Sequence, residues 1–177
     1  MSEIKGKLYT TDLNTLLVFN NSIKCKFLDK VMPVITNLGG AIATISTCLV
    51  IIALGRGMVG RMGVQALIAL TVSHLIVHFL KNSVCRPRPK DVLPNINTFD
   101  VSLDYYSFPS GHTTAAFAIA TTLALNLHIL AFICFPLAFI VAISRLYLGV
   151  HYPSDVLAGI AVAIFSSIVI HSVISLI

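Results

Sequence analysis

The sequence has 177 residues, of which 56% are hydrophobic and only 11% charged, and its mean hydropathy is +0.91. The interior of one soluble domain cannot bury that much apolar side chain, so the composition excludes a soluble enzyme and indicates an integral membrane protein. The formal charge of +5 comes from lysines and arginines that form no long basic run, which favours membrane lipids and phosphate over nucleic acid as partners.

Residues 8–30 form the first segment with a helical pattern. Leu13, Leu16 and Leu17 recur there at helical spacing, and polar residues such as Asp12 fall between them. This pattern predicts an amphipathic helix that lies in the membrane interface, with a sixth, weakly apolar span as the alternative. No compact apolar stretch with a small-residue cleavage site follows the N-terminal lysines, so we expect no removable signal peptide.

Long stretches without charged side chains locate the membrane spans, because a helix needs about 20 residues to cross a hydrocarbon layer of roughly 30 Å. The uncharged stretch at residues 105–144 is long enough for two crossings, with a turn expected at residues 126–128. The other spans are expected within residues 31–55, 62–80 and 156–177. The sequence therefore predicts one all-α domain over residues 1–177, an integral membrane helical bundle with about five transmembrane helices.

The long polar connection over residues 81–110 follows the second of these spans. Connections of this length in compact proteins are usually functional, so we expect an active-site loop here. A second polar cluster, at residues 109–112, opens the third span. A third cluster, at residues 144–155, follows the fourth span. Two crossings separate the second cluster from the third, so all the clusters are expected on the same side of the membrane.

These clusters contain three cations, Lys81, Arg88 and Arg145, at one expected depth of the membrane. Charge is costly there without a counter-ion, so an anion should lie among them. Arginine has a planar fork of donors that suits phosphate oxygens, and lysine adds a compact positive charge. Ser110 and Gly111 are expected to begin a helix, whose free N–H groups also favour an anion. The sequence therefore predicts a phosphate-binding site.

Two histidines and a carboxylate supply candidate chemistry at this site. His151 and Asp155 are four residues apart and share a face if their junction is helical. The carboxylate can then hold one ring nitrogen of His151 while the other attacks phosphorus, and His112 can protonate the leaving oxygen. No paired carboxylates stand near the cations, so we expect hydrolysis without a metal ion or other cofactor.

Other polar residues near these clusters can each be interpreted in two ways. His74 and His78 share a helical face with Lys81, which indicates either a two-histidine metal site or the polar wall of a substrate channel. We expect the channel wall, because no third ligand is evident. Arg86 and Lys90 either hold a second phosphate or meet lipid headgroups.

In these motifs the sequence resembles the type 2 phosphatidic acid phosphatase superfamily, membrane lipid phosphatases related to vanadium-dependent haloperoxidases. The family pattern is a lysine followed after six residues by Arg-Pro, then Pro-Ser-Gly-His, and finally Ser-Arg, five intervening residues, a histidine, three intervening residues and an aspartate. The pattern is met here by Lys81 with Arg88-Pro89, by Pro109 to His112, and by Ser144-Arg145 with His151 and Asp155.

The resemblance implies a role for each matched residue. His151 would attack phosphorus and form a phosphohistidine, Asp155 would orient it, and His112 would protonate the leaving oxygen. The remaining matched residues would bind the phosphoryl oxygens: Lys81, Arg88, Ser110, Gly111 and Arg145. The implied substrate is a lipid phosphate or diphosphate, with undecaprenyl diphosphate, phosphatidylglycerophosphate and phosphatidate as candidates.

The resemblance also implies an active site on the extracytoplasmic face of the cell membrane. The distribution of positive charge favours the reverse, because five lysines near the N-terminus would then lie outside and only Arg56 and Arg61 inside. Two alternatives to a phosphatase also stand. A membrane lipid transporter or translocator would likewise contain intramembrane cations and histidines. A haloperoxidase relative would share the phosphate-type pocket.

Overall fold

A computed structural model describes residues 2–99 and 105–176, and every regular element within them is helical. The α-helices are α1 (Ser2–Leu17), α2 (Lys26–Ile35), α3 (Ala41–Leu54), α4 (Met58–Val84), α5 (Pro89–Val92), α6 (Gly111–Asn126), α7 (Ala131–Tyr147) and α8 (Pro153–Ser175). Three shorter segments join them: the π-helix η1 (Val18–Ser22) and the 3-10 helices η2 (Thr36–Gly39) and η3 (His128–Leu130).

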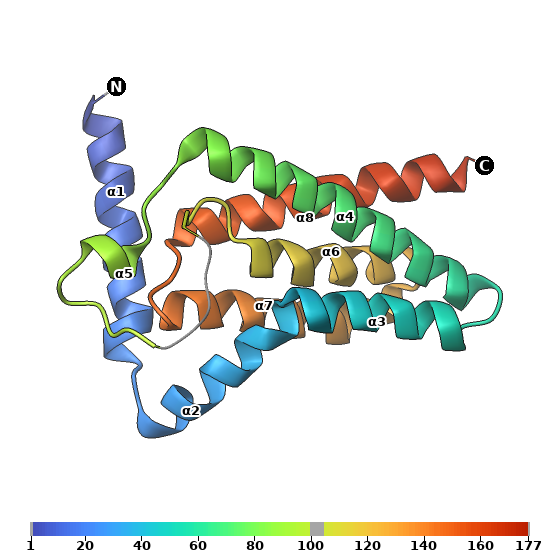
Figure 1. Cartoon of the computed structure of the whole chain (residues 1–177), viewed down its shortest axis with the longest axis horizontal. Coiled ribbons are helices and arrows are strands. Elements are labelled where there is room, and N and C mark those ends of the chain that lie inside the picture. The colour runs from blue at the N-terminus through green and yellow to red at the C-terminus, as the bar shows by residue number, and fades with distance from the viewer. Residues whose placement is uncertain (1, 100–104, 177) are drawn as a thin grey trace.

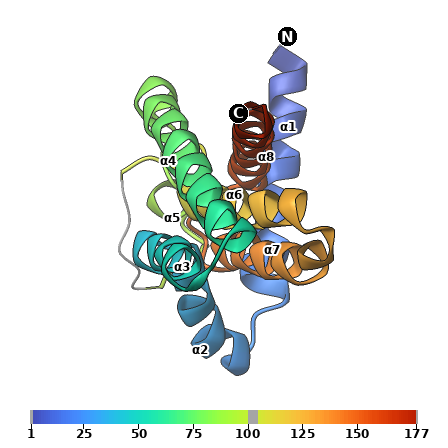
Figure 2. The same ribbon diagram turned by 90° about the vertical axis from the view of Figure 1, so that its right-hand side faces the viewer.

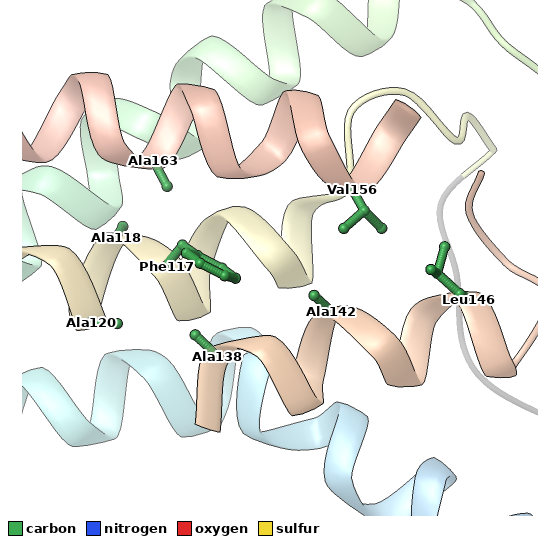
Figure 3. Close-up of a cluster of buried hydrophobic side chains, with 8 residues drawn as sticks. All are labelled: Phe117, Ala118, Ala120, Ala138, Ala142, Leu146, Val156 and Ala163. Carbon is green, nitrogen blue, oxygen red and sulfur yellow. The ribbon is translucent and has the colours of Figure 1, made fainter. Parts of the chain in front are cut away.

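Helix α6 lies at the centre of the bundle and packs against α3, α4, α7 and α8 (Figures 1 and 2). Its sequence is rich in alanine and threonine, whose small side chains let neighbouring helices approach closely. Phe117 of α6 packs among alanines of α6, α7 and α8, including Ala138, Ala142 and Ala163 (Figure 3). A Cβ atom at Gly159 of α8 would lie 2.8 Å from the Ser110 carbonyl oxygen, so glycine allows α8 to reach the start of α6.

Three segments are individually long and apolar enough to cross a membrane: Met58–Val92, His128–Tyr147 and Pro153–Ser175. A fourth span is possible if Lys26–Gly39 and Ala41–Leu54, which meet at a bend of 52°, cross together. The remaining predicted span corresponds to α6, which has 16 residues, fewer than the roughly 20 that a straight crossing needs. The described residues thus form the predicted all-α bundle, with the 16-residue helix α6 in the middle.

The single interfacial helix predicted over residues 8–30 is wrong in its extent. Helix α1 ends at Leu17, η1 follows it, and the chain is extended at Cys25 before α2 begins. Helix α1 lies crosswise at the end of the bundle where α5 and the starts of α6 and α8 are found (Figure 1). Helical periodicity identified the apolar face of this segment but not the break, because the break depends on contacts with distant residues.

The predicted active-site loop at residues 81–110 also differs in detail. Lys81 belongs to the last turn of α4, which ends at Val84 because Cys85 adopts a left-handed backbone conformation with φ of 50°. The short helix α5 follows within the connection. Helix α6 begins at Gly111 with Ser110 before it, as predicted, and the Ser110 amide donates a hydrogen bond to the Asp155 carbonyl oxygen. The connection is therefore tied to the start of α8.

Asn20 of η1 holds the N-terminal segment to the bundle. Its side chain is fully buried and donates to the carbonyl oxygens of Tyr147 at 2.8 Å and of Asn97 at 3.0 Å. The Asn20 side-chain oxygen accepts a hydrogen bond from the Asn97 amide at 2.7 Å. One side chain therefore joins η1, the connection after α5 and the end of α7.

We expect Asn20→Ala to lower the free energy of unfolding, because each buried polar group left without a partner costs about 1–3 kcal/mol. The measurement is thermal unfolding in detergent, followed by circular dichroism. The matched control is Asn14→Ala, an exposed position on α1, which should change stability by less than about 0.5 kcal/mol. Equal stability of the two variants would show that Asn20 does not anchor this segment.

Candidate active site

The polar clusters singled out in the sequence meet at one end of the bundle. The C-terminal ends of α4 and α7 and the N-terminal ends of α6 and α8 lie together there, beside α1 and α5 (Figure 1). This arrangement is the one predicted from the number of crossings between the clusters. Residues separated by more than 60 positions in the sequence therefore surround a common space.

That space is a cavity of about 580 Å³ with two kinds of wall. Lys81, Arg88, Arg145 and His151 line one part of it. Apolar residues of α3 and α4, such as Ile45, Leu67 and Leu75, line another. Ile45 and Leu75 are also exposed on the surface of the bundle, so the cavity opens sideways between these helices.

His151 lies in the turn between α7 and α8 and is only 1% exposed. Its Nε2 atom lies 3.2 Å from Nη1 of Arg88, and its Nδ1 atom lies 3.6 Å from Oδ2 of Asp155. Arginine can only donate a hydrogen bond, so this contact places the lone pair of His151 on Nε2 and the ring proton on Nδ1. That tautomer leaves the lone pair on Nε2 and directs the N–H group toward the carboxylate.

The surroundings of His151 also keep its ring neutral. Burial lowers the pKa of His151 well below its ordinary value of 6.5, and the positive charges of Arg145 and Arg88 lower it further, with contributions from Lys81 and His112. A neutral imidazole retains the lone pair that attack on phosphorus requires. The ring of His151 therefore keeps an available lone pair at neutral pH.

Asp155 occupies the first turn of α8 and is fully buried. Its Oδ2 atom accepts a hydrogen bond from the Tyr152 amide at 2.8 Å, and this is the same oxygen that faces His151. Its Oδ1 atom accepts a hydrogen bond from Nη1 of Arg86 at 2.7 Å. The carboxylate is thus held from both sides, with one oxygen directed at the histidine.

The three predicted phosphate-binding cations are buried and held by hydrogen bonds. Lys81 donates to the Tyr106 carbonyl oxygen at 3.2 Å, and Arg88 donates to the Val150 carbonyl oxygen at 2.9 Å. Arg145, in the last turn of α7, donates to the hydroxyl of Thr36 in η2 at 2.6 Å. Because these bonds orient the side chains, the positive charge in the cavity does not depend on mobile surface groups.

The start of α6 contributes backbone groups to the same cavity. Gly111 and His112 line it, whereas Ser110 lies behind them, with its hydroxyl 2.9 Å from that of Thr113. A Cβ atom at Gly39 of η2 would lie 2.7 Å from the His112 carbonyl oxygen. Glycine at the bend before α3 therefore lets η2 approach the first turn of α6.

The structure brings six of the eight predicted site residues to the cavity wall and places Ser110 and Asp155 behind it. His74 and His78 also line the cavity, as expected for a channel wall. Within residues 2–99 and 105–176, no three histidine, cysteine or acidic side chains are grouped to hold a metal ion.

Two polar residues at the site were missed or misread in the sequence. Thr36 had no sequence signal, because its role depends on a contact with Arg145 that crosses 109 positions. Arg86 is not part of the cavity wall and donates to Asp155 and Asp12, contacts that its position in the sequence did not indicate.

Comparison with known proteins is consistent with the three motifs. The PAP2 superfamily matches residues 63–176. The bacitracin transport permease protein BcrC of Bacillus licheniformis is 34% identical over 107 residues, which are 60% of this chain and 53% of that protein. The undecaprenyl-diphosphatase BcrC of Bacillus subtilis is 30% identical over 146 residues, 77% of this chain and 70% of that protein.

A solved structure with the same fold is the transmembrane PAP2 type phosphatidylglycerolphosphate phosphatase from Bacillus subtilis. It superposes with a TM-score of 0.80 at 26% sequence identity, covering 97% of this chain and 88% of that one. The chain spans about half the length of several curated relatives that it matches. The family match covers well over half of the chain, and this protein is therefore a helical membrane protein that belongs to the PAP2 superfamily.

Proposed function

We propose that the protein hydrolyses a phosphate or diphosphate group from a membrane lipid, with His151 as the nucleophile. The observation that carries this proposal is the cavity, which joins a neutral, buried histidine and three cations to an apolar wall that opens sideways. A lipid phosphate has the matching chemistry, because its headgroup is anionic and its tail is apolar. The fixed cations favour phosphate binding, and Nε2 of His151 supplies the reacting atom.

In the first step, the Nε2 lone pair of His151 attacks phosphorus and forms an N–P bond. The bond between phosphorus and the leaving oxygen breaks, and His112 donates its proton to that oxygen. Asp155 stabilises the positive charge that develops on the ring of His151, whose Nδ1 proton stays in place. The products of this step are a phosphohistidine and the lipid that has lost the phosphoryl group.

In the second step, water attacks the phosphohistidine. His112 is now neutral and accepts a proton from the water as the new oxygen–phosphorus bond forms. The N–P bond breaks, the electron pair returns to Nε2 of His151, and inorganic phosphate leaves. Both histidines then have their starting protonation states, so the cycle needs no other reactant.

Positive charge in the cavity stabilises the transition state. Lys81, Arg88 and Arg145 and the N-terminal amides of α6 are directed at a space in which the phosphoryl oxygens accumulate negative charge. Fixed groups of this kind need no reorganisation during the reaction. We propose that they supply the electrostatic stabilisation without a metal ion.

The candidate substrates are undecaprenyl diphosphate, phosphatidylglycerophosphate and phosphatidate. The names of an undecaprenyl-diphosphatase relative and of a phosphatidylglycerolphosphate phosphatase neighbour support the first two. All three place a phosphate beside a long apolar tail, which suits the wall formed by Ile45, Leu67 and Leu75. Phosphate release from each lipid in detergent, measured side by side, distinguishes among them.

We expect His151→Gln to lower kcat by at least about 10³-fold, because it removes the attacking nitrogen from a buried site. Inorganic phosphate release in the presence of EDTA measures this loss. The matched control is His128→Gln, an exposed position in η3 at the other end of the bundle, which should keep the wild-type rate. Rapid alkaline quenching of the wild type should trap phosphate on His151, because the N–P bond of a phosphohistidine is stable in base and breaks in acid, and the variant should trap none.

Full activity in His151→Gln would show that another residue is the nucleophile. Loss of the wild-type rate in EDTA that returns with added Mg²⁺ would contradict a reaction without metal. The name of one relative, a transport permease protein, suggests a separate outcome. A transporter would be favoured if the wild type released no phosphate and the His151→Gln variant still moved lipid between the leaflets of liposomes.

The pH dependence of kcat/KM follows from the lowered pKa of His151. A histidine with a lowered pKa takes up its proton only at lower pH, so the nucleophile should stay neutral as the pH falls through 6.5. We therefore expect the acid limb that belongs to the enzyme to lie below pH 6.5. Two substrates whose phosphates titrate at different pH separate this limb from ionisation of the substrate. An enzyme limb centred at pH 6.5 would contradict the prediction.

We propose that the active site faces the extracytoplasmic side of the cell membrane. Cys85 is exposed at the end of α4 and offers a direct test. A variant that keeps Cys85 and replaces Cys25, Cys48 and Cys134 by serine should react with a membrane-impermeant maleimide in intact cells. Labelling that occurs only after the cells are permeabilised would place the site on the cytoplasmic side, as the lysine distribution favours.

A further inference from the structure

Asp12 of α1 is joined by hydrogen bonds to Ser154 and Arg86, which lie next to Asp155 of the proposed active site. Its Oδ1 atom accepts a hydrogen bond from the Ser154 amide at 2.9 Å, and its Oδ2 atom accepts one from the Ser154 hydroxyl. Oδ2 also accepts a hydrogen bond from Nη2 of Arg86 at 2.9 Å. The side chain of Asp12 is only 11% exposed. A residue near the N-terminus is therefore fixed to the first turn of α8.

Arg86 connects Asp12 to the catalytic carboxylate. Its Nη1 atom donates to Oδ1 of Asp155 and to the Ser154 hydroxyl, each at 2.7 Å. The centre of its guanidinium group lies 3.8 Å from the centroid of the Tyr152 ring, which holds it from a further side. The guanidinium thus uses one nitrogen for each carboxylate, and neither carboxylate can move without disturbing the other.

On the basis of the proposed function, we infer that Asp12 is a remote positioning residue for the phosphatase reaction. Asp12 fixes Arg86, Arg86 fixes Oδ1 of Asp155, and the second oxygen of Asp155 then points at Nδ1 of His151. Asp12 itself lies outside residues 63–176, the segment matched by the family. The machinery of this chain therefore extends into a helix that the family motifs do not include.

This network acts on His151 through its charge as well as through its geometry. Arg86 lies between two carboxylates, so its positive charge is shared between Asp12 and Asp155. Removing the charge of Asp12 leaves more of the arginine's charge to offset Asp155, which disfavours a proton on His151. Removing Arg86 has the opposite effect, because Asp155 is then left without its cation. A purely structural role predicts no such pair of opposite effects.

The experiment compares kcat, KM and the acid limb of kcat/KM for Asp12→Asn, Arg86→Gln and the double variant. We expect Asp12→Asn to lower kcat by about 10- to 100-fold. Losses of this size are typical when a residue that orients a functional side chain by hydrogen bonding is removed. KM should change by less than about threefold, because neither residue lines the cavity. In the Arg86→Gln background, Asp12→Asn should lower kcat by less than about twofold further, since its effect passes through Arg86.

The acid limb separates positioning from folding. We expect Arg86→Gln to move this limb to higher pH, and Asp12→Asn to leave it in place or move it lower. The variants do not alter the ionisable groups that face His151 from the elements around it: Lys81 of α4, Arg88 before α5, His112 of α6, Arg145 of α7 and Asp155 of α8. A shift therefore reports the loss of charge at Asp12 or Arg86.

The control is Asp91→Asn, which removes one exposed negative charge from α5 at the same end of the bundle. It should keep the wild-type kcat. Rates are divided by the amount of folded protein, measured by helical circular dichroism and gel filtration. If Asp12→Asn does not fold, Arg86→Lys keeps the charge but loses the fork of donors, and it should lower kcat while keeping the acid limb of the wild type.

The inference would be overturned if Asp12→Asn had the wild-type kcat. It would also be overturned if the reduction of kcat in the double variant were the product of the reductions in the two single variants. Both results would leave the proposed function intact. A wild type that releases no phosphate from any of the three lipids would overturn the proposed function itself, and the inference with it. The two failures are therefore distinct.

Discussion

A buried imidazole that must stay neutral among positive charges is the constraint on which the rest of this structure depends. Arg88 contacts one ring nitrogen of His151 and Asp155 faces the other, so both the lone pair and the proton have defined positions. The same three cations that suit a phosphate also oppose protonation of the ring. The positive charge that favours anion binding therefore acts together with burial, the largest cause of the lowered pKa of His151, to keep the ring neutral.

Irregular backbone gathers at this end of the bundle because straight helices alone do not converge on one ligand. The bend of 52° between η2 and α3 brings Thr36 against Arg145 and Gly39 against His112. The turn between α7 and α8 carries His151, and the left-handed residue Cys85 releases the chain from α4 toward Arg88. At the other end of the bundle, the connections are short and carry none of the proposed site residues.

The sequence was enough to predict a helical membrane bundle, the clustering of motifs at one end and the cations of the cavity. The helices and the cations follow from composition and local spacing, and the clustering follows from the number of crossings between the motifs. The contacts of Asp12 with Ser154, and of Thr36 with Arg145, span 142 and 109 positions and leave no periodic trace. The break after η1 was missed for the same reason, because Asn20 is engaged by Asn97 and Tyr147 rather than by its own helix.

The two walls of the cavity also separate what the proposed reaction releases. In the proposed reaction, the dephosphorylated lipid returns along the apolar wall of α3 and α4 to hydrocarbon, whereas inorganic phosphate is released into water. Substrate and lipid product then never leave the bilayer plane. Turnover is accordingly governed by the mole fraction of substrate among the surrounding lipids rather than by its bulk concentration, and diluting the membrane with inert lipid slows the enzyme even when total substrate is constant.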